Sequence, residues 1–328
     1  MVGYFVDANL QQIIQTTKSF FQKNSIYGKK KMKKFITLIL LTIVIQSCNT
    51  LSHTKKTYVH QFAASTKDLP KYSLKFNQTL SNVRKSRGIY FANTLSTPSL
   101  HLTELDNIHT QQKLDERKTI LFQNSFEILN TYSKILLALS SDVYVDDLYN
   151  NIKELEYDLE SLINLNNKLT LFNTPTGFVN IGAKIGVISG RIYINQKQSK
   201  EIKILLNSSD TLITNVSNNI ISYLDSKNLK AIIDNEDNML SINYLSYIQQ
   251  SNRTNISNDL EYIQLKSNID NIKQLRKTLI ICMTNLKESH KVMVEEINKK
   301  NSTMDSINEI KELAKSILEI NQIVKELK

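Results

Sequence analysis

The chain has 328 residues, enough to bury one sizeable core or two, and its mean hydropathy of −0.27 excludes a polytopic membrane protein. Most of the net charge of +10 comes from residues 1–47, because the remaining 281 residues carry 34 basic and 30 acidic side chains. No later stretch concentrates Lys and Arg among aromatic residues, which excludes the electrostatic footprint of a nucleic-acid-binding protein.

The first element that the sequence predicts is a signal peptide over residues 32–47. Lysines surround Met32 in the run K-K-K-M-K-K, and an apolar run of eleven residues follows from Phe35 to Ile45. A basic segment, a short apolar run and a small residue before the cut are the parts of a signal peptide. Eleven helical residues reach only about 16 Å, so the run is too short to cross a bilayer core of roughly 30 Å.

The end of this segment resembles the lipobox of bacterial lipoproteins. Ile45 stands third before Cys48 and Ser47 immediately precedes it, while Gln46 departs from the usual pattern. In that class a diacylglyceryl group is attached to the cysteine, and the signal is cut just ahead of it. The resemblance implies a lipid on Cys48, a membrane bound through that lipid, and a place in the bacterial cell envelope, at the outer membrane or the periplasmic face.

The segments on either side of the signal are assigned from position and composition. Signal peptides normally begin a chain, so residues 1–31 are interpreted as an upstream extension with Met32 as the true start. The alternative is a cytoplasmic extension on a signal anchor. Residues 48–68 are polar and contain His53 and His60, and they are predicted to form a flexible tether.

A helical domain is predicted over residues 69–328. The chain has only 7 Gly and 3 Pro, and none of either follows Gly190. Because sheet proteins need turn residues about every ten positions, this absence favours an all-α fold. Apolar residues recur at spacings of three and four on narrow stripes, which are typical of helical hairpins. We therefore expect an elongated bundle of long antiparallel helices with coiled-coil-like hairpins.

Two helices are expected before residue 140. The first covers residues 69–86, and its candidate buried positions are Leu74, Leu80 and Val83. Residues 88–110 hold Pro98 and show little periodicity, so they are predicted to form a loop or short irregular elements. From residue 111 onward, an apolar stripe indicates a second helix, with Leu114, Leu121, Ile128, Tyr132, Ile135 and Leu139 on it.

A predicted break at residues 140–145 separates this helix from a third stripe. Turn residues at 173–177, Pro175 among them, end the third stripe. Its spacing predicts the seam of a coiled coil or a long helical hairpin, formed by Leu148, Ile152, Leu155, Leu159, Leu162 and Leu169.

Gly182, Gly186 and Gly190 form the run G-x-x-x-G-x-x-x-G. On a helix they share nearly one face and let another backbone approach closely, at a cost of about 1 kcal/mol per glycine relative to Ala. We interpret them as helix-packing residues. The alternative is a segment that enters a membrane, as in helical pore-forming proteins. A phosphate loop is not predicted, because no Lys-Ser or Lys-Thr follows at the required spacing.

Two further helices are expected near the C-terminus. Leu260 and Ile263 begin the first, which continues along the stripe Ile272, Leu275, Leu279, Cys282 and Leu286. Cys282 is therefore interpreted as a small buried hydrophobe, and the alternative is a reactive thiol. Ser302, with Asp305 three residues later, is a candidate cap for the last helix. The stripe of that helix keeps spacings of three and four: Ile310, Leu313, Ile317, Ile320, Val324 and Leu327.

The sequence shows no constellation of catalytic or metal-binding residues. The five histidines form no H-x-x-x-H or H-E-x-x-H pattern, neither cysteine belongs to a metal-spaced pair, and no G-x-S-x-G elbow occurs. His101 and His109 would meet only if the loop predicted around them folded in their favour. Acidic pairs such as Glu295 and Glu296 are interpreted as solvated faces. We therefore predict no catalytic residue, no metal and no cofactor.

The leading hypothesis is a structural or interaction protein, held to a membrane by the lipid on Cys48, that presents long helices to a protein partner. The alternative is a membrane-active helical protein in which the Gly182–Gly190 segment inserts. An enzyme is the third and least supported class. The stripes alone do not separate the helix faces that bind a partner from those that form the core.

Overall fold

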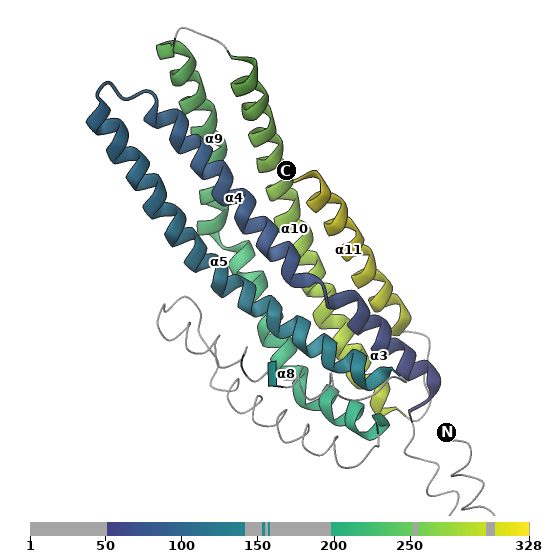
Figure 1. The fold of residues 1–328 in the computed structure, drawn as a ribbon. Helices are drawn as coiled ribbons and strands as arrows, with labels where there is room; N and C mark the ends of the chain where they lie inside the picture. The colour runs from purple at the N-terminus through teal and green to yellow at the C-terminus, as the bar shows by residue number, and fades with distance from the viewer. Residues whose placement is uncertain are drawn as a thin grey trace, which may run out of the picture. The chain divides into compact units, whose positions relative to one another are not determined.

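The computed structural model describes residues 51–141, 153, 154, 157, 198–251, 255–299 and 306–327. Every regular element within these ranges is a helix (Figure 1). The helices are α3 (His53–Thr66), α4 (Leu69–Ala92), α5 (Pro98–Ser140), α8 (Gln198–Asp225), α9 (Lys227–Ser251), α10 (Ile256–Asn298) and α11 (Ser306–Glu326). They pack against one another through one hydrophobic core, which confirms the predicted all-α helical bundle.

The helices follow one another in long runs. Only residues 67 and 68 separate α3 from α4, and only Ser226 separates α8 from α9. Helices α5 and α10 each have 43 residues, and a helix of that length extends about 65 Å. Each of these two helices runs back alongside the helices that precede it (Figure 1).

Short polar side chains start several of the helices. In each case an oxygen of the side chain accepts a hydrogen bond from a backbone N–H of the first turn, which has no partner within the helix. The Oγ of Ser226 accepts from the N–H of Leu229 at 3.2 Å, so the serine that interrupts the run also starts α9. The other caps of this kind are Ser52 for α3, Thr97 for α5 and Asn255 for α10.

The five-helix region contains the largest buried side chains. We define it as five helical segments that pack on one another. The first is α3 together with residues 69–79 of α4, counted as one because only two residues separate these helices. The others are residues 120–140 of α5, α8, residues 274–298 of α10, and α11. Its core is aromatic and aliphatic, and the ring centroids of Phe122 and Phe126 are 5.0 Å apart. Among the described residues, all ten of the largest fully buried side chains lie here: Tyr72, Tyr132, Phe62, Phe76, Phe122, Phe126, Leu69, Ile128, Leu129 and Ile135.

The hairpin region has a thinner and more polar core. We define it as residues 80–92 of α4, residues 98–119 of α5, α9, and residues 256–273 of α10. Here α4 is the common neighbour, since it packs against α5, α9 and α10. The large buried apolar side chains of this region are Leu, Ile and Val residues together with Tyr90 and Tyr244, whose rings lie 5.0 Å apart. The ring of the half-buried Tyr262 stacks on that of Tyr244 at 4.5 Å.

The flexible tether predicted over residues 48–68 is wrong from residue 53 onward. Helix α3 occupies most of that stretch and buries Val59, Phe62 and Ala63 in the five-helix region. Its apolar stripe is short and set among polar residues, so its composition resembles that of a linker. Helix α3 is stabilised by packing against α5 and α11, which cannot be seen from the composition of the segment.

The loop predicted over residues 88–110 is also wrong. Helix α4 continues to Ala92 and α5 begins at Pro98, which leaves a turn of five residues. Proline is well suited to the first turn of a helix, because its missing N–H would have had no partner there. The predicted break after residue 140 is confirmed, since α5 ends at Ser140.

The predicted stripes of α10 and α11 are confirmed except at the start of α10. Cys282 and the four other stripe residues from Ile272 to Leu286 are buried. Along α11, the stripe residues are buried apart from the half-buried Val324. Leu260 and Ile263, in contrast, are 62% and 61% exposed. The periodicity identified the helix correctly, but the side chains on that face of the first turns of α10 are exposed.

Candidate functional site

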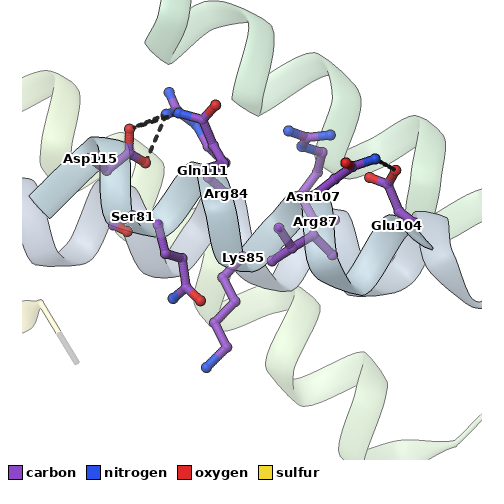
Figure 2. A pocket seen from close by; sticks show the side chains of 11 residues that line it. Ser81, Arg84, Lys85, Arg87, Glu104, Asn107, Gln111 and Asp115 are labelled. Carbon is purple, nitrogen blue, oxygen red and sulfur yellow. Dashed lines mark hydrogen bonds and ion pairs between the residues drawn. The ribbon is translucent and has the colours of Figure 1, made fainter. Parts of the chain in front are cut away.

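A polar pocket lies in the hairpin region, between α4 and α5 (Figure 2). It has a volume of about 250 Å³. Helix α4 lines it with Ser81, Arg84, Lys85, Arg87 and Gly88, and helix α5 lines it with Glu104, Asn107, Ile108, Gln111, Gln112 and Asp115. Most of these side chains are polar, which distinguishes the pocket from a gap in the apolar core.

Gly88 lets the two helices approach closely beside this pocket. A Cβ atom at this position would lie 2.8 Å from Cγ1 of Ile108, closer than real side chains come. Glycine in a helix interior costs about 1 kcal/mol relative to alanine. Here the missing side chain allows Ile108 to pack directly on the backbone of α4, which aligns the polar side chains of the two helices.

An ion-pair network holds the arginines of the pocket in place. Nη1 of Arg84 donates to both carboxylate oxygens of Asp115, at 2.6 and 2.8 Å (Figure 2). Nε of Arg84 and Nε of Arg87 donate to the two oxygens of Glu236 on α9, at 3.0 and 2.8 Å. The Glu236 side chain is only 5% exposed, so this carboxylate depends on the two guanidinium groups for its solvation.

The network leaves some donors and acceptors of the pocket-lining side chains unused. Among the described contacts, Nη2 of Arg84 and Nη1 of Arg87 donate to no protein atom. The amide nitrogens of Asn107 and Gln111 donate to Glu104 and Asp115, at 3.2 and 3.1 Å. Their amide oxygens therefore remain as acceptors. The pocket thus offers guanidinium donors on α4 and amide acceptors on α5.

A second polar cluster is buried in the five-helix region. The hydroxyl of Tyr132 lies 2.7 Å from Nε2 of His290, and the Oγ of Ser209 donates to that hydroxyl at 2.9 Å. Nδ1 of His290 lies 3.0 Å from Oδ1 of Asp210. Burial lowers the pKa of His290, and hydrogen bonding to His290 lowers the pKa of Asp210. A neutral imidazole with its proton on Nδ1 satisfies both contacts.

This cluster resembles an Asp–His pair of a hydrolase in its bonding, but its geometry favours a structural role. Nε2 of His290, the atom that would act as a general base, is occupied by Tyr132. The imidazole is 1% exposed, so no substrate reaches it. The cluster satisfies buried polar groups on α5, α8 and α10 and thereby fixes how these helices align.

The end of the hairpin region exposes apolar side chains. Ile256, Leu260 and Ile263 lie four and three residues apart on α10 and are 78%, 62% and 61% exposed. We call these three residues the α10 stripe. Across the described residues, nine of the thirteen exposed large hydrophobic side chains belong to the hairpin region, the others there being Phe91, Leu100, Leu102, Leu114, Ile242 and Leu245. Such a concentration is typical of an interaction surface.

Most of the sequence-predicted site residues lie outside the described residues. These include Cys48 and the glycines Gly182, Gly186 and Gly190. Cys282 is described, and burial raises the pKa of its thiol to about 12, as expected of an unreactive core cysteine. His101 and His109 lie on α5 rather than in a loop, and Nδ1 of His101 contacts the carbonyl oxygen of Ala92 at 2.8 Å.

The pocket was not predicted from the sequence. Arg84 and Arg87 are three residues apart and could have been placed on one face of a helix. Glu236 lies about 150 residues away on α9, and no local pattern links it to them. The only local signal is Gly88, a glycine in a segment that is otherwise compatible with a helix.

No protein-family model, curated protein or solved structure matches the chain. None of the helices in the described ranges combines the length and apolar composition needed to cross a membrane. The same ranges hold no group of three or more His, Cys, Asp or Glu side chains arranged to bind a metal ion. The candidate functions therefore depend on the pocket, the α10 stripe and the signal at Cys48.

Proposed function

We propose that this chain is a lipid-anchored protein of the bacterial cell envelope that acts by binding a helical partner protein and catalyses no reaction. The α10 stripe is the observation that carries the partner-binding role. Its spacing of four and three residues is that of a coiled-coil seam, and a seam of this kind pairs with the apolar face of another helix. The expected partner segment is thus an amphipathic helix.

The anchoring role rests on the sequence. The basic segment, the apolar run and the cysteine at its end together support a lipid on Cys48. A single acyl chain gives only reversible membrane binding, whereas two or more give stable anchoring, so the diacylglyceryl group of this class is sufficient by itself. The membrane is then a second partner, bound through lipid rather than through the described helices.

The partner-binding role is tested by photo-crosslinking from the α10 stripe. A photoreactive residue replaces Leu260, and a matched control replaces Ile281, which is 52% exposed on the same helix within the five-helix region. We expect residue 260 to crosslink to an amphipathic helix of another protein in intact cells, and that purified partner to bind the full-length chain. Equal crosslinking from both positions, or crosslinking only to lipid, would contradict the proposal.

The anchor is tested by incorporation of labelled palmitate in a Gram-negative host. Label should appear on the wild-type chain and be lost in Cys48→Ala, because the thioether link needs the cysteine sulfur. Label on both chains, or on neither, would overturn the anchoring role and leave the crosslinking test of the α10 stripe unaffected.

A further inference from the structure

We propose that the pocket between α4 and α5 binds a small ligand with one free carboxylate and at least one amide N–H, such as a dipeptide. This inference goes beyond partner binding, because the pocket is lined by α4 and α5 and includes no residue of the α10 stripe. It rests on the unused hydrogen-bonding groups of the lining side chains, on the charge balance of the pocket and on its size.

The donors for the carboxylate are Nη2 of Arg84 and Nη1 of Arg87. Arginine suits this task, since its planar guanidinium matches the two oxygens of a carboxylate. Both side chains are already held by Glu236, whose own side chain is 5% exposed. A ligand therefore meets donors that are fixed before it arrives, and it avoids part of the entropic cost of ordering two long side chains.

The acceptors for the ligand N–H lie on the opposite wall. The amide oxygens of Asn107 and Gln111 are oriented by their nitrogens, which donate to Glu104 and Asp115 (Figure 2). An acceptor needs a donor, so a ligand made only of oxygen acceptors, such as sulfate, would use one wall and leave the other without partners. A peptide-like carboxylate has both kinds of group.

The charge balance favours a ligand without net charge, such as a zwitterionic dipeptide. The charges of Arg84 and Arg87 are matched by Asp115 and Glu236. The remaining charged side chains at the pocket, Lys85 and Glu104, have opposite signs. The site therefore has no excess positive charge to hold a polyanion, and hydrogen bonds decide the ligand. The volume of about 250 Å³ is slightly below the range of roughly 300–1,000 Å³ for drug-sized ligands, which limits the ligand to one or two residues.

The test is isothermal titration of the purified full-length chain with alanyl-alanine. Two probes separate the chemistry: alanyl-alanine amide lacks the carboxylate, and sodium sulfate lacks any hydrogen-bond donor. We expect alanyl-alanine to bind and each of the other probes to bind at least about tenfold more weakly, a difference of about 1.4 kcal/mol. No binding of alanyl-alanine, or tighter binding of either comparison probe, would overturn the proposal.

Variants locate the binding to the pocket. Arg87→Ala should weaken alanyl-alanine binding by at least about tenfold, since a charge-assisted hydrogen bond is lost. Because this change also removes an ion pair with Glu236, Asn107→Leu is the second variant, and it should weaken binding without lowering the melting temperature. Arg276→Ala, a control at an arginine paired with Asp225, should bind normally. Unchanged binding in both pocket variants would contradict the assignment.

Discussion

The five-helix region and the hairpin region are continuous along α5 and α10, yet different interactions stabilise them. The five-helix region buries aromatic and aliphatic side chains between helices on several sides. In the hairpin region α4 is the shared neighbour, and the buried aliphatic side chains are joined by tyrosines and by ion pairs. More of the exposed large apolar side chains also lie here. Both regions therefore have a buried apolar core, but the hairpin region adds buried charges and carries most of the exposed apolar side chains among the described residues.

The charges of the hairpin region extend this contrast. Besides the Glu236 network, Asp237 on α9 pairs with Lys266 and Lys273 on α10. Tyr244 donates a hydrogen bond to Asp259 across the same hairpin. These contacts are directional and depend on ionisation, whereas burial of aliphatic groups does not. The two regions should therefore respond differently to mutation, salt and pH.

The largest expected effect is the loss of an aromatic side chain from the five-helix region. Phe126 is fully buried, so Phe126→Ala should lower the free energy of unfolding by about 3–5 kcal/mol, since it loses burial and leaves a cavity. Chemical denaturation followed by circular dichroism measures the change. Leu260→Ala on the exposed α10 stripe is the control and should change stability by less than about 0.5 kcal/mol. Equal effects would remove the distinction between the regions.

The next effect is the loss of the buried carboxylate in the hairpin region. Glu236→Gln should lower the free energy of unfolding by about 2–3 kcal/mol, because Arg84 and Arg87 lose a shared partner while remaining partly solvated. The same denaturation experiment at low and high salt measures it. Asp234→Asn, at a side chain that is 68% exposed, is the matched control and should have little effect. A change as small as that of the control would show that the network is not needed for stability.

A smaller effect is expected from the buried cluster at His290. Tyr132→Phe should lower the free energy of unfolding by about 1–2 kcal/mol, because Nε2 of His290 and the Oγ of Ser209 lose a hydrogen-bond partner. Chemical denaturation measures the change. Phe122→Tyr is the control, because it adds a hydroxyl at another buried ring of α5 instead of removing one. It should lower stability by burying an additional polar group, and it should leave the pH dependence of the His290 cluster unchanged.

The pH dependence of stability follows from the same cluster. The pKa of His290 is lower in the folded protein than the value of about 6.5 in an unfolded chain, so the unfolded state takes up the proton first as the pH falls. Stability should be full above about pH 6.5 and decline below it. The lowered pKa of Asp210 acts only below about pH 4. Unfolding measured at about pH 7 and pH 5 should show a smaller difference in His290→Asn; an unchanged difference would contradict this assignment.

The smallest expected effect concerns the contact between α4 and α5. Gly88→Ala gains about 1 kcal/mol of helix propensity and loses a similar amount to the clash with Ile108, so its net effect should lie within about 1 kcal/mol. In the Ile108→Ala variant the clashing side chain is absent. Adding Gly88→Ala to that variant should therefore raise stability by about 1 kcal/mol relative to Ile108→Ala alone. A double-mutant cycle measures the difference, and additive effects would show that the two residues do not interact.

Local patterns determined much of the fold. The absence of Gly and Pro after Gly190 and the stripes along α10 and α11 predicted long helices, because helical periodicity repeats over many residues and needs no distant partner. The same stripes identified Cys282 as buried. The prediction was wrong at residues 53–66, where a short stripe in a polar setting becomes a helix only through burial against α5 and α11.

The all-α class and the apolar stripes of α10 and α11 could be predicted from the sequence, since each is specified by neighbouring residues. The signal ahead of Cys48 stays a prediction. Only the tertiary structure decided which stripes are covered. Leu260 and Leu275 lie on stripes of the same helix, but Leu275 is fully buried whereas Leu260 is 62% exposed. The tertiary fold also brings Glu236 to Arg84 and Arg87, because a pocket between helices depends on contacts between residues far apart in the chain.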